Sequence, residues 1–179
     1  MMTEKLQKEL NVQINAEMWS SNLYLSMAFY LKNKGLDGCA NWLMKQSQEE
    51  LNHAYEIADY LNKRGEKAEV GMVDVVPTGW GDVAEVFKNV YDHECHVSKL
   101  IDELVDVASA EKDKATQDFL WGFVREQVEE EATARDLAEK FAKADLVTNI
   151  FRDVILDEKF AKAGEAGILF LDSQLAQRK

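Results

Sequence analysis

Polar residues in the first half of the chain match polar residues in the second half at one fixed spacing. Three pairs are each separated by 77 residues: Glu17 and Glu94, Glu50 and Gln127, and His53 and Glu130. All of them interrupt stripes of apolar residues that recur at three- and four-residue steps, as on the buried face of a helix. Two helical hairpins therefore carry the same polar set at the same depth. Because buried carboxylates are costly without a positive partner, a cation is expected among them.

The periodicity predicts an all-α fold, and the chain has only one proline, Pro77. We expect four long helices, over residues 3–34, 37–64, 82–109 and from 113 to about 144. Residues 66–81, which hold Pro77 and three glycines, read as a long connection. Sixteen extended residues reach about 53 Å, whereas a 25-residue helix is about 38 Å long. The connection can thus cross the whole bundle and leave the second and third helices parallel.

Composition narrows the class of protein. The 179 residues suit one domain with a sizeable core, and the formal net charge of −12 argues against nucleic acid and anionic membranes as partners. No signal peptide or run of 18 apolar residues is found, so a cytoplasmic location is expected. Cys39 and Cys95 form no C-x-x-C motif and imply no disulfide framework.

The polar set has the chemistry of a two-metal site. Glu50 and His53 lie one helical turn apart on one face, and Glu94 is the only charged residue on the inward face of the third helix. Oxygen-rich sites with one histidine suit iron or manganese better than structural zinc, which prefers sulfur and nitrogen. Two divalent ions would balance the four carboxylates of the layer.

These residues resemble those of the prokaryotic non-haem ferritins of the ferroxidase-competent type, over residues 1–144 and 163–179. The resemblance implies a first iron site formed by Glu17, Glu50 and His53. Glu50 would bridge to a second iron held by Glu94 and Glu130, with Gln127 nearby. A third, looser iron site would use the acidic residues Glu49, Glu126, Glu129 and Glu130. Tyr24 matches a tyrosine that hydrogen-bonds or donates an electron near the two irons.

The resemblance also implies an activity and an assembly. Two Fe(II) ions would each pass an electron to O2, and the Fe(III) would be deposited as mineral inside a homo-oligomeric shell, a 24-mer in the family. Bacterioferritins and rubrerythrins would repeat Glu-x-x-His on the fourth helix, where this chain has Gln127-x-x-Glu130. Asn52 replaces the haem-ligating methionine of bacterioferritins, so no haem is expected. A different di-metal oxidase, perhaps with manganese, stays open.

The C-terminal third contains a repeat. The segment Glu139–Ala144 recurs 19 residues later as Glu158–Ala163 with the same sequence, EKFAKA. We therefore expect a single ferritin-like domain with a bundle over 3–144, an inserted segment at 145–163 and a short fifth helix over 164–178. The insert carries an apolar stripe that needs burial: Leu146, Val147, Ile150, Phe151, Val154 and Ile155. Either it folds back or the assembly changes, and an engineered or rearranged structural protein cage that retains an inherited di-iron site is the alternative function.

Overall fold

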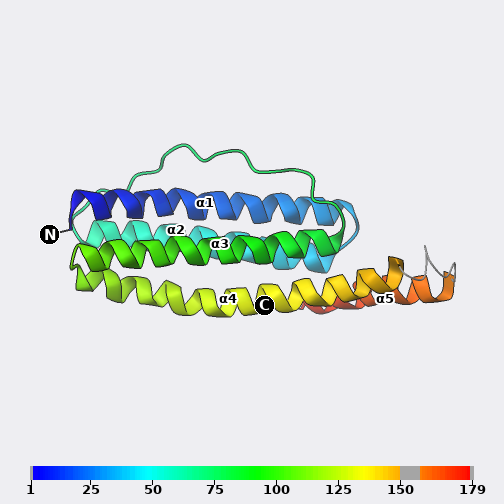
Figure 1. Cartoon of the computed structure of the whole chain (residues 1–179). Helices are drawn as coiled ribbons and strands as arrows, with labels where there is room; N and C mark the ends of the chain where they lie inside the picture. The colour runs from blue at the N-terminus through cyan, green and yellow to red at the C-terminus, as the bar shows by residue number, and fades with distance from the viewer. Residues whose placement is uncertain (1, 150–157, 178–179) are drawn as a thin grey trace.

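The computed structural model describes residues 2–149 and 158–177, and these form five α-helices and no strand (Figure 1). The helices are α1 (Glu4–Asn33), α2 (Asp37–Lys63), α3 (Val83–Ala110), α4 (Lys114–Asn149) and α5 (Glu158–Leu175). The first four lie alongside one another as a bundle, and α5 lies back along α4. The all-α four-helix bundle with a long crossover and a C-terminal fifth helix is confirmed.

Local signals in the sequence set most helix ends. The Thr3 hydroxyl accepts a hydrogen bond of 3.3 Å from the amide of Leu6, and Asp82 and Glu85 form a reciprocal capping box at the start of α3. Gly35 and Gly65 follow α1 and α2 with φ of +78° and +79°, a conformation that side chains with a Cβ rarely adopt. The expected starts and ends of the first three helices, and the start of the fourth, are therefore correct to within one residue.

The crossover between α2 and α3 runs along the outside of α1 (Figure 1), and α2 and α3 are parallel as expected. It has no sheet partner, so α1 side chains bond to its backbone. Asn11 accepts from the amide of Glu69, Asn15 accepts from the amide of Gly71, and the Trp19 indole donates to the carbonyl of Val75. These α1 residues recur every four positions and form a polar stripe along the side of α1 that the crossover covers.

A polar layer divides the hydrophobic core into two clusters. One cluster contains Leu31, Leu43 and Phe87, with Phe87 stacked on Phe141 at 4.4 Å between ring centroids. The other contains Leu10 and Ile57. Between them lie the buried polar side chains of the bundle centre: Glu17, Gln46, Ser47, Glu50, Glu94 and Gln127. Each helix of the bundle thus supplies apolar residues at both ends and polar residues in the middle.

The C-terminal helices differ from the sequence expectation. The fourth helix continues past residue 144 to Asn149, and α5 begins at Glu158 and ends at Leu175, whereas the expected fifth helix spans 164–178. The described ends of the expected insert, residues 145–149 and 158–163, are therefore helical, and the Glu, Lys and Ala of the second EKFAKA copy favour a helix there. Leu146 is 58% exposed rather than buried. The side chains of Val147, Ile150, Phe151, Val154 and Ile155 lie outside the described residues.

Folding back brings α5 onto the first turn of α2. The Asp172 carboxylate accepts a hydrogen bond of 2.7 Å from the amide of Cys39, which no residue of α2 itself caps. A Cβ at Gly38 would overlap the Asp172 carbonyl oxygen and approach the amide of Ala176 to 3.0 Å. Burial, followed by the Asp172 carboxylate, also raises the pKa of the Cys39 thiol. Asp172 therefore caps a helix 133 residues earlier in the chain.

We expect Gly38→Ala to push α5 off the start of α2 and to lower the free energy of unfolding by about 1–3 kcal/mol, as overpacking does. The control is Gly122→Ala in α4, where the added Cβ meets no atom within 4 Å and should stabilise the helix by up to about 1 kcal/mol. Denaturant unfolding and limited proteolysis of the C-terminal helix measure both variants. Equal stability of the two variants would contradict the docked position of α5.

Candidate metal centre

Three side chains from α1 and α2 converge in the polar layer. One ligand atom each of Glu17, Glu50 and His53 lies within 4.8 Å of the other two, and no other trio of this kind is found in residues 2–149 and 158–177. Glu17 is 1% and Glu50 3% exposed. The structure therefore brings these three side chains together.

The two carboxylates have oxygens without hydrogen-bond partners. Glu17 Oε2 and Glu50 Oε2 are both buried and unpartnered. Burial, followed by the negative charge of Glu50, raises the pKa of Glu17 well above its usual range. Burial likewise raises the pKa of Glu50. Because an unpaired buried acceptor is costly, these oxygens fit a bound cation, which would replace the missing donors.

His53 links this pair to a fourth acid. Its Nδ1 lies 3.5 Å from Glu50 Oε2 and its Nε2 lies 3.3 Å from Glu126 Oε1. Burial lowers the pKa of His53, but the contacts with Glu126 and Glu50 outweigh burial and raise it to about 11. The proton on the imidazole thus supplies positive charge in the layer, and a metal bound to this ring would displace it.

Glu94 enters the layer from α3. Its Oε1 accepts a hydrogen bond from the fully buried hydroxyl of Tyr24, and its Oε2 accepts one of 3.2 Å from the amide of Gln127. Burial raises the pKa of Glu94 to about 7; these two bonds oppose the rise, and the charges of Glu130 and Glu17 add to it. Burial and the charge of Glu94 raise the pKa of Tyr24. Tyr24 is therefore a neutral donor that orients this carboxylate.

Glu130 comes from α4, and its Oε2 accepts a hydrogen bond of 3.1 Å from Gln46. The charge of Glu130 acts on Glu94 and on Tyr24, so all three face the same layer. Glu94 and Glu130 do not complete a second trio within 4.8 Å in the described parts of the chain. The structure thus brings the first expected metal site closer to ligand geometry than the second.

Comparisons with known proteins show the family to which the chain belongs. The model of the ferritin-like domain matches residues 7–144. The bacterial non-heme ferritin of Bacteroides fragilis strain 638R is 59% identical over 178 residues, which cover 99% of this chain and 100% of that protein. The chain belongs to the ferritin family. A bacterial non-heme ferritin of Campylobacter jejuni is 36% identical over 140 residues, covering 78% of this chain and 84% of the relative.

Solved ferritin structures have the same fold as this ferritin chain. An open pore ferritin from the archaeon Archaeoglobus fulgidus superposes with a TM-score of 0.87 at 41% identity, over all of both chains. A structure described as a humanized archaeal ferritin superposes with the same score at 40% identity, over all of this chain and 99% of the other. No helix in the described residues is long and apolar enough to cross a membrane.

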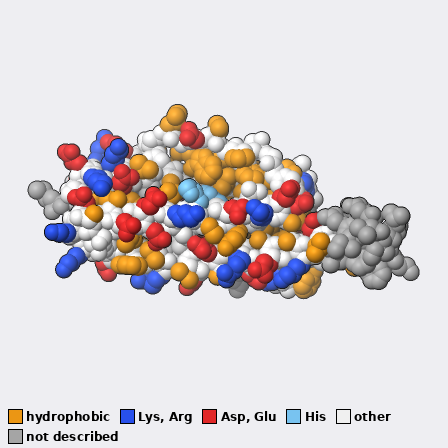
Figure 2. Space-filling view, viewed as in Figure 1, with side chains coloured by type: hydrophobic (Ala, Val, Ile, Leu, Met, Phe, Trp, Pro, Cys, Tyr) orange, Lys and Arg blue, Asp and Glu red, His pale blue; other side chains and the backbone are white. Residues whose placement is uncertain are grey.

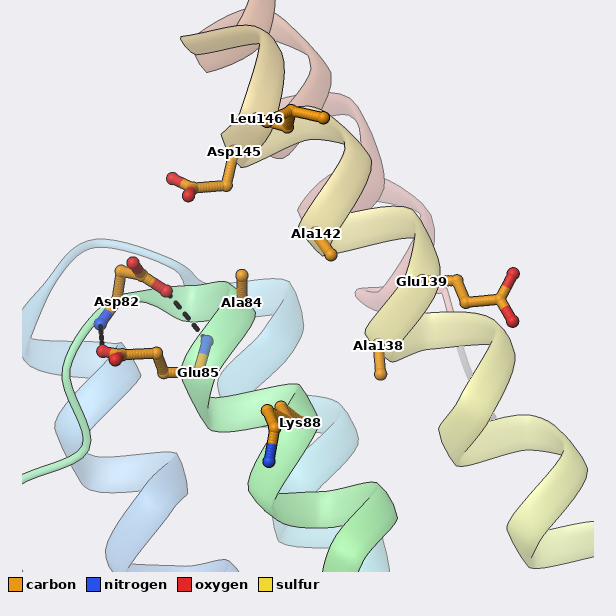
Figure 3. A pocket seen from close by; sticks show the side chains of 9 residues that line it. All are labelled: Asp82, Ala84, Glu85, Lys88, Ala138, Glu139, Ala142, Asp145 and Leu146. Carbon is orange, nitrogen blue, oxygen red and sulfur yellow. Dashed lines mark hydrogen bonds between the residues drawn. The ribbon is translucent and has the colours of Figure 1, made fainter. Parts of the chain in front are cut away.

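The residues expected at a third ferritin iron site are only partly gathered. Glu126 contacts His53 and is 48% exposed, while Glu49 is half-buried on α2 and Glu129 is exposed on α4. The third site therefore stays a prediction from the sequence. A hollow of about 440 Å³ between the start of α3 and the end of α4 offers no comparable site (Figure 3). Alanine and leucine side chains line it together with charged ones, and two of its acids, Asp82 and Glu85, are used in the capping box.

Two features of the layer were not expected from the sequence. Gln13 donates a hydrogen bond of 2.8 Å to Glu17 but is not among the residues that the 77-residue spacing indicates, although its i, i+4 spacing to Glu17 is a usable signal. His93 and His96 flank Glu94 in the sequence, and their positions on a helix predict that both point away from its face as exposed polar residues. Instead the Nε2 of His93 lies 2.8 Å from the Ser20 hydroxyl and its ring packs between Trp19 and Tyr24. Only His96 of that pair is exposed, and hydrophobic side chains gather beside the histidine surface in Figure 2.

Proposed function

We propose that this chain stores iron and oxidises Fe(II) with O2 in the polar layer. The observation that carries the proposal is the pair of buried, unpartnered oxygens of Glu17 and Glu50 beside the His53 imidazole, in a chain of the ferritin family. Fe(II) is the substrate of this reaction. A carboxylate-rich layer with one imidazole offers the oxygen and nitrogen ligands that suit Fe(II).

The proposed roles follow the positions of the side chains. Glu17, Glu50 and His53 hold the first Fe(II), and Glu94 and Glu130 hold the second with Gln127 beside it. Glu50 is shared by both ions. Each Fe(II) gives one electron, so O2 takes up two electrons and two protons and leaves as H2O2. Tyr24 orients Glu94 through its hydroxyl and is a candidate for a further electron.

The proposal extends to the fate of the product and to the assembly. The acidic side chains Glu126, Glu129 and Glu49 line the way out of the layer and form the third iron site. The Fe(III) collects as mineral inside a homo-oligomeric shell, with 24 subunits if the family arrangement holds. The segment 145–163 is an insertion into a single ferritin-like domain. The cytoplasmic location stays a prediction.

A titration of the metal-free protein with Fe(II) tests the proposal. Under anaerobic conditions, we expect about two Fe(II) per subunit to bind tightly, one at each position of the di-iron layer, and the third site to bind more loosely. On admitting O2, the first turnover should consume one O2 for every two Fe(II), measured with an oxygen electrode. Two results would contradict the di-iron assignment: saturation at one ion per subunit, or oxidation of Fe(II) in air at the same rate as in buffer alone.

The alternative is a structural cage whose metal site is inherited, and the described ends of the insert are the observation that favours it. They lengthen α4 and place α5 back along it, which changes the surface at that end of the bundle. Native mass of the purified particle gives the subunit number. An intact particle that takes up no Fe(II) would favour the alternative, and preferential oxidation of Mn(II) would favour a different di-metal oxidase.

A further inference from the structure

The polar layer contains more glutamines than the proposed metal ligands need. Gln13 is 3% exposed and Gln46 is 1% exposed, and neither is among the residues proposed to bind iron. A buried amide needs hydrogen-bond partners, and both find one on a carboxylate of the layer. Gln13 donates to Glu17 Oε1 at 2.8 Å, and Gln46 donates to Glu130 Oε2 at 3.1 Å.

A third glutamine follows the same pattern on α4. Gln127 donates to Glu94 Oε2 at 3.2 Å, and its amide also lies 3.4 Å from the Glu94 backbone carbonyl. Three of the four carboxylates therefore have one oxygen that accepts a hydrogen bond from the side-chain amide of a glutamine in the layer. An amide is neutral at every pH, so it can hold a carboxylate without competing with the cation for charge.

Glu50 is the exception. Among the hydrogen bonds of the described residues, no glutamine donates to it, and its Oε2 is one of the two buried oxygens without a partner. The other unpartnered oxygen, Oε2 of Glu17, belongs to a carboxylate whose Oε1 is already held by Gln13. Glu17 thus presents one oxygen to an ion, whereas Glu50 keeps both oxygens clear of amides. A carboxylate that bridges two ions needs both oxygens, and a terminal ligand needs one.

We propose that Gln13 and Gln46 are positioning residues that fix Glu17 and Glu130 as terminal ligands and leave Glu50 as the bridge. This inference rests on the proposed di-iron function. The amides hold one oxygen of each terminal carboxylate and so fix the rotamer of its side chain before the ion arrives. Groups that orient metal ligands in this way typically change metal affinity by about 10–100-fold when removed.

Co(II) binding to the metal-free protein tests the proposal, because Co(II) fills oxygen and nitrogen sites without reacting with O2 under mild conditions, and its visible spectrum reports ligand geometry. Gln13→Met keeps the length of the side chain and removes the amide. We expect it to weaken binding of the ion at Glu17, Glu50 and His53 by about 10–100-fold and to alter that ion's visible bands. Gln46→Met should have the same effect on the other ion.

Gln48→Met is the matched control, because Gln48 lies on the exposed face of α2 and donates to Asn52 outside the layer. Its Co(II) affinities should equal those of the wild type. The proposal is overturned if Gln13→Met and Gln46→Met are folded, have the native mass and bind both ions within twofold of the control with unchanged bands. If a methionine variant fails to assemble, Gln13→Leu and Gln46→Leu provide the same comparison.

The outcome separates this inference from the function on which it rests. Wild-type protein that binds two Co(II) per subunit, together with glutamine variants that behave like the control, leaves the di-iron proposal intact and removes only the positioning role. Wild-type protein that binds no Co(II) in the layer would instead remove the proposed function.

Discussion

Glu50→Ala is expected to lose Fe(II) oxidation almost completely, with an initial rate about 100-fold or more below that of the wild type. Loss of a group that merely orients a ligand already costs about 10–100-fold in metal affinity, and Glu50 is proposed to be a ligand of both ions. Its removal also takes away the carboxylate that contacts His53 Nδ1 at 3.5 Å. Stopped-flow absorbance of Fe(III) formation measures the rate.

The control is Glu56→Ala, which removes an exposed acid from the same helix, about one turn beyond His53. Its rate should match the wild type, which separates the effect of the ligand from that of the net charge. Unfolding is not the expected cause of the loss, because burial disfavours the Glu50 carboxylate and its Oε2 has no hydrogen-bond partner. The contact that the variant loses, with His53 Nδ1, is a long one at 3.5 Å. Similar oxidation rates in Glu50→Ala and Glu56→Ala would contradict the assignment of the site.

Metal-free Glu94→Gln is expected to gain stability relative to the wild type as the pH rises from about 4.5 to about 7. The pKa of Glu94 is about 7 in the folded protein, against 4.5 for an ordinary glutamate. Between these values the unfolded chain releases the proton and the folded protein keeps it, so ionisation favours unfolding. The wild type should lose about 3 kcal/mol relative to the variant over this window, and no more from Glu94 above it.

Denaturant unfolding of chelator-treated protein at pH 4.5, 5.5, 7 and 8 measures this difference. The comparison with the variant is needed because burial lowers the pKa of His93 to about 4, which changes stability in the opposite direction over much of the same window. His93 is present in both proteins, so its contribution cancels. If the difference in unfolding free energy between the wild type and the variant does not depend on pH, burial does not raise the pKa of Glu94 in the metal-free layer.

The sequence is sufficient for much of the bundle because its signals are local. Thr3, Gly35, Gly65 and the Asp82–Glu85 box act within one helical turn, so the helix ends they set follow from the order of residues. The 77-residue spacing likewise indicates Glu17, Glu50 and His53, because a helix places residues at three- and four-residue steps on one face. The convergence of these three side chains is predictable from that pattern.

Other features depend on contacts between residues far apart in the chain. The polar stripe of Asn11, Asn15 and Trp19 makes the apolar pattern of α1 irregular in the sequence. Only the structure shows that these side chains form hydrogen bonds with the backbone of the crossover. The capping of Cys39 by Asp172 joins residues 133 positions apart and requires α5 to fold back. Periodicity gives no information on either contact.

The sequence by itself determines which side chains reach the centre of the bundle, because helical geometry converts spacing directly into a shared face. Only the tertiary structure decides which oxygen of each carboxylate is held by an amide and which is left without a partner. That distinction depends on Gln13, Gln46 and Gln127 meeting Glu17, Glu130 and Glu94 at hydrogen-bond distance. Hydrogen bonds act over about 3 Å, and so their pattern is set by packing between helices rather than by the order of residues along one of them.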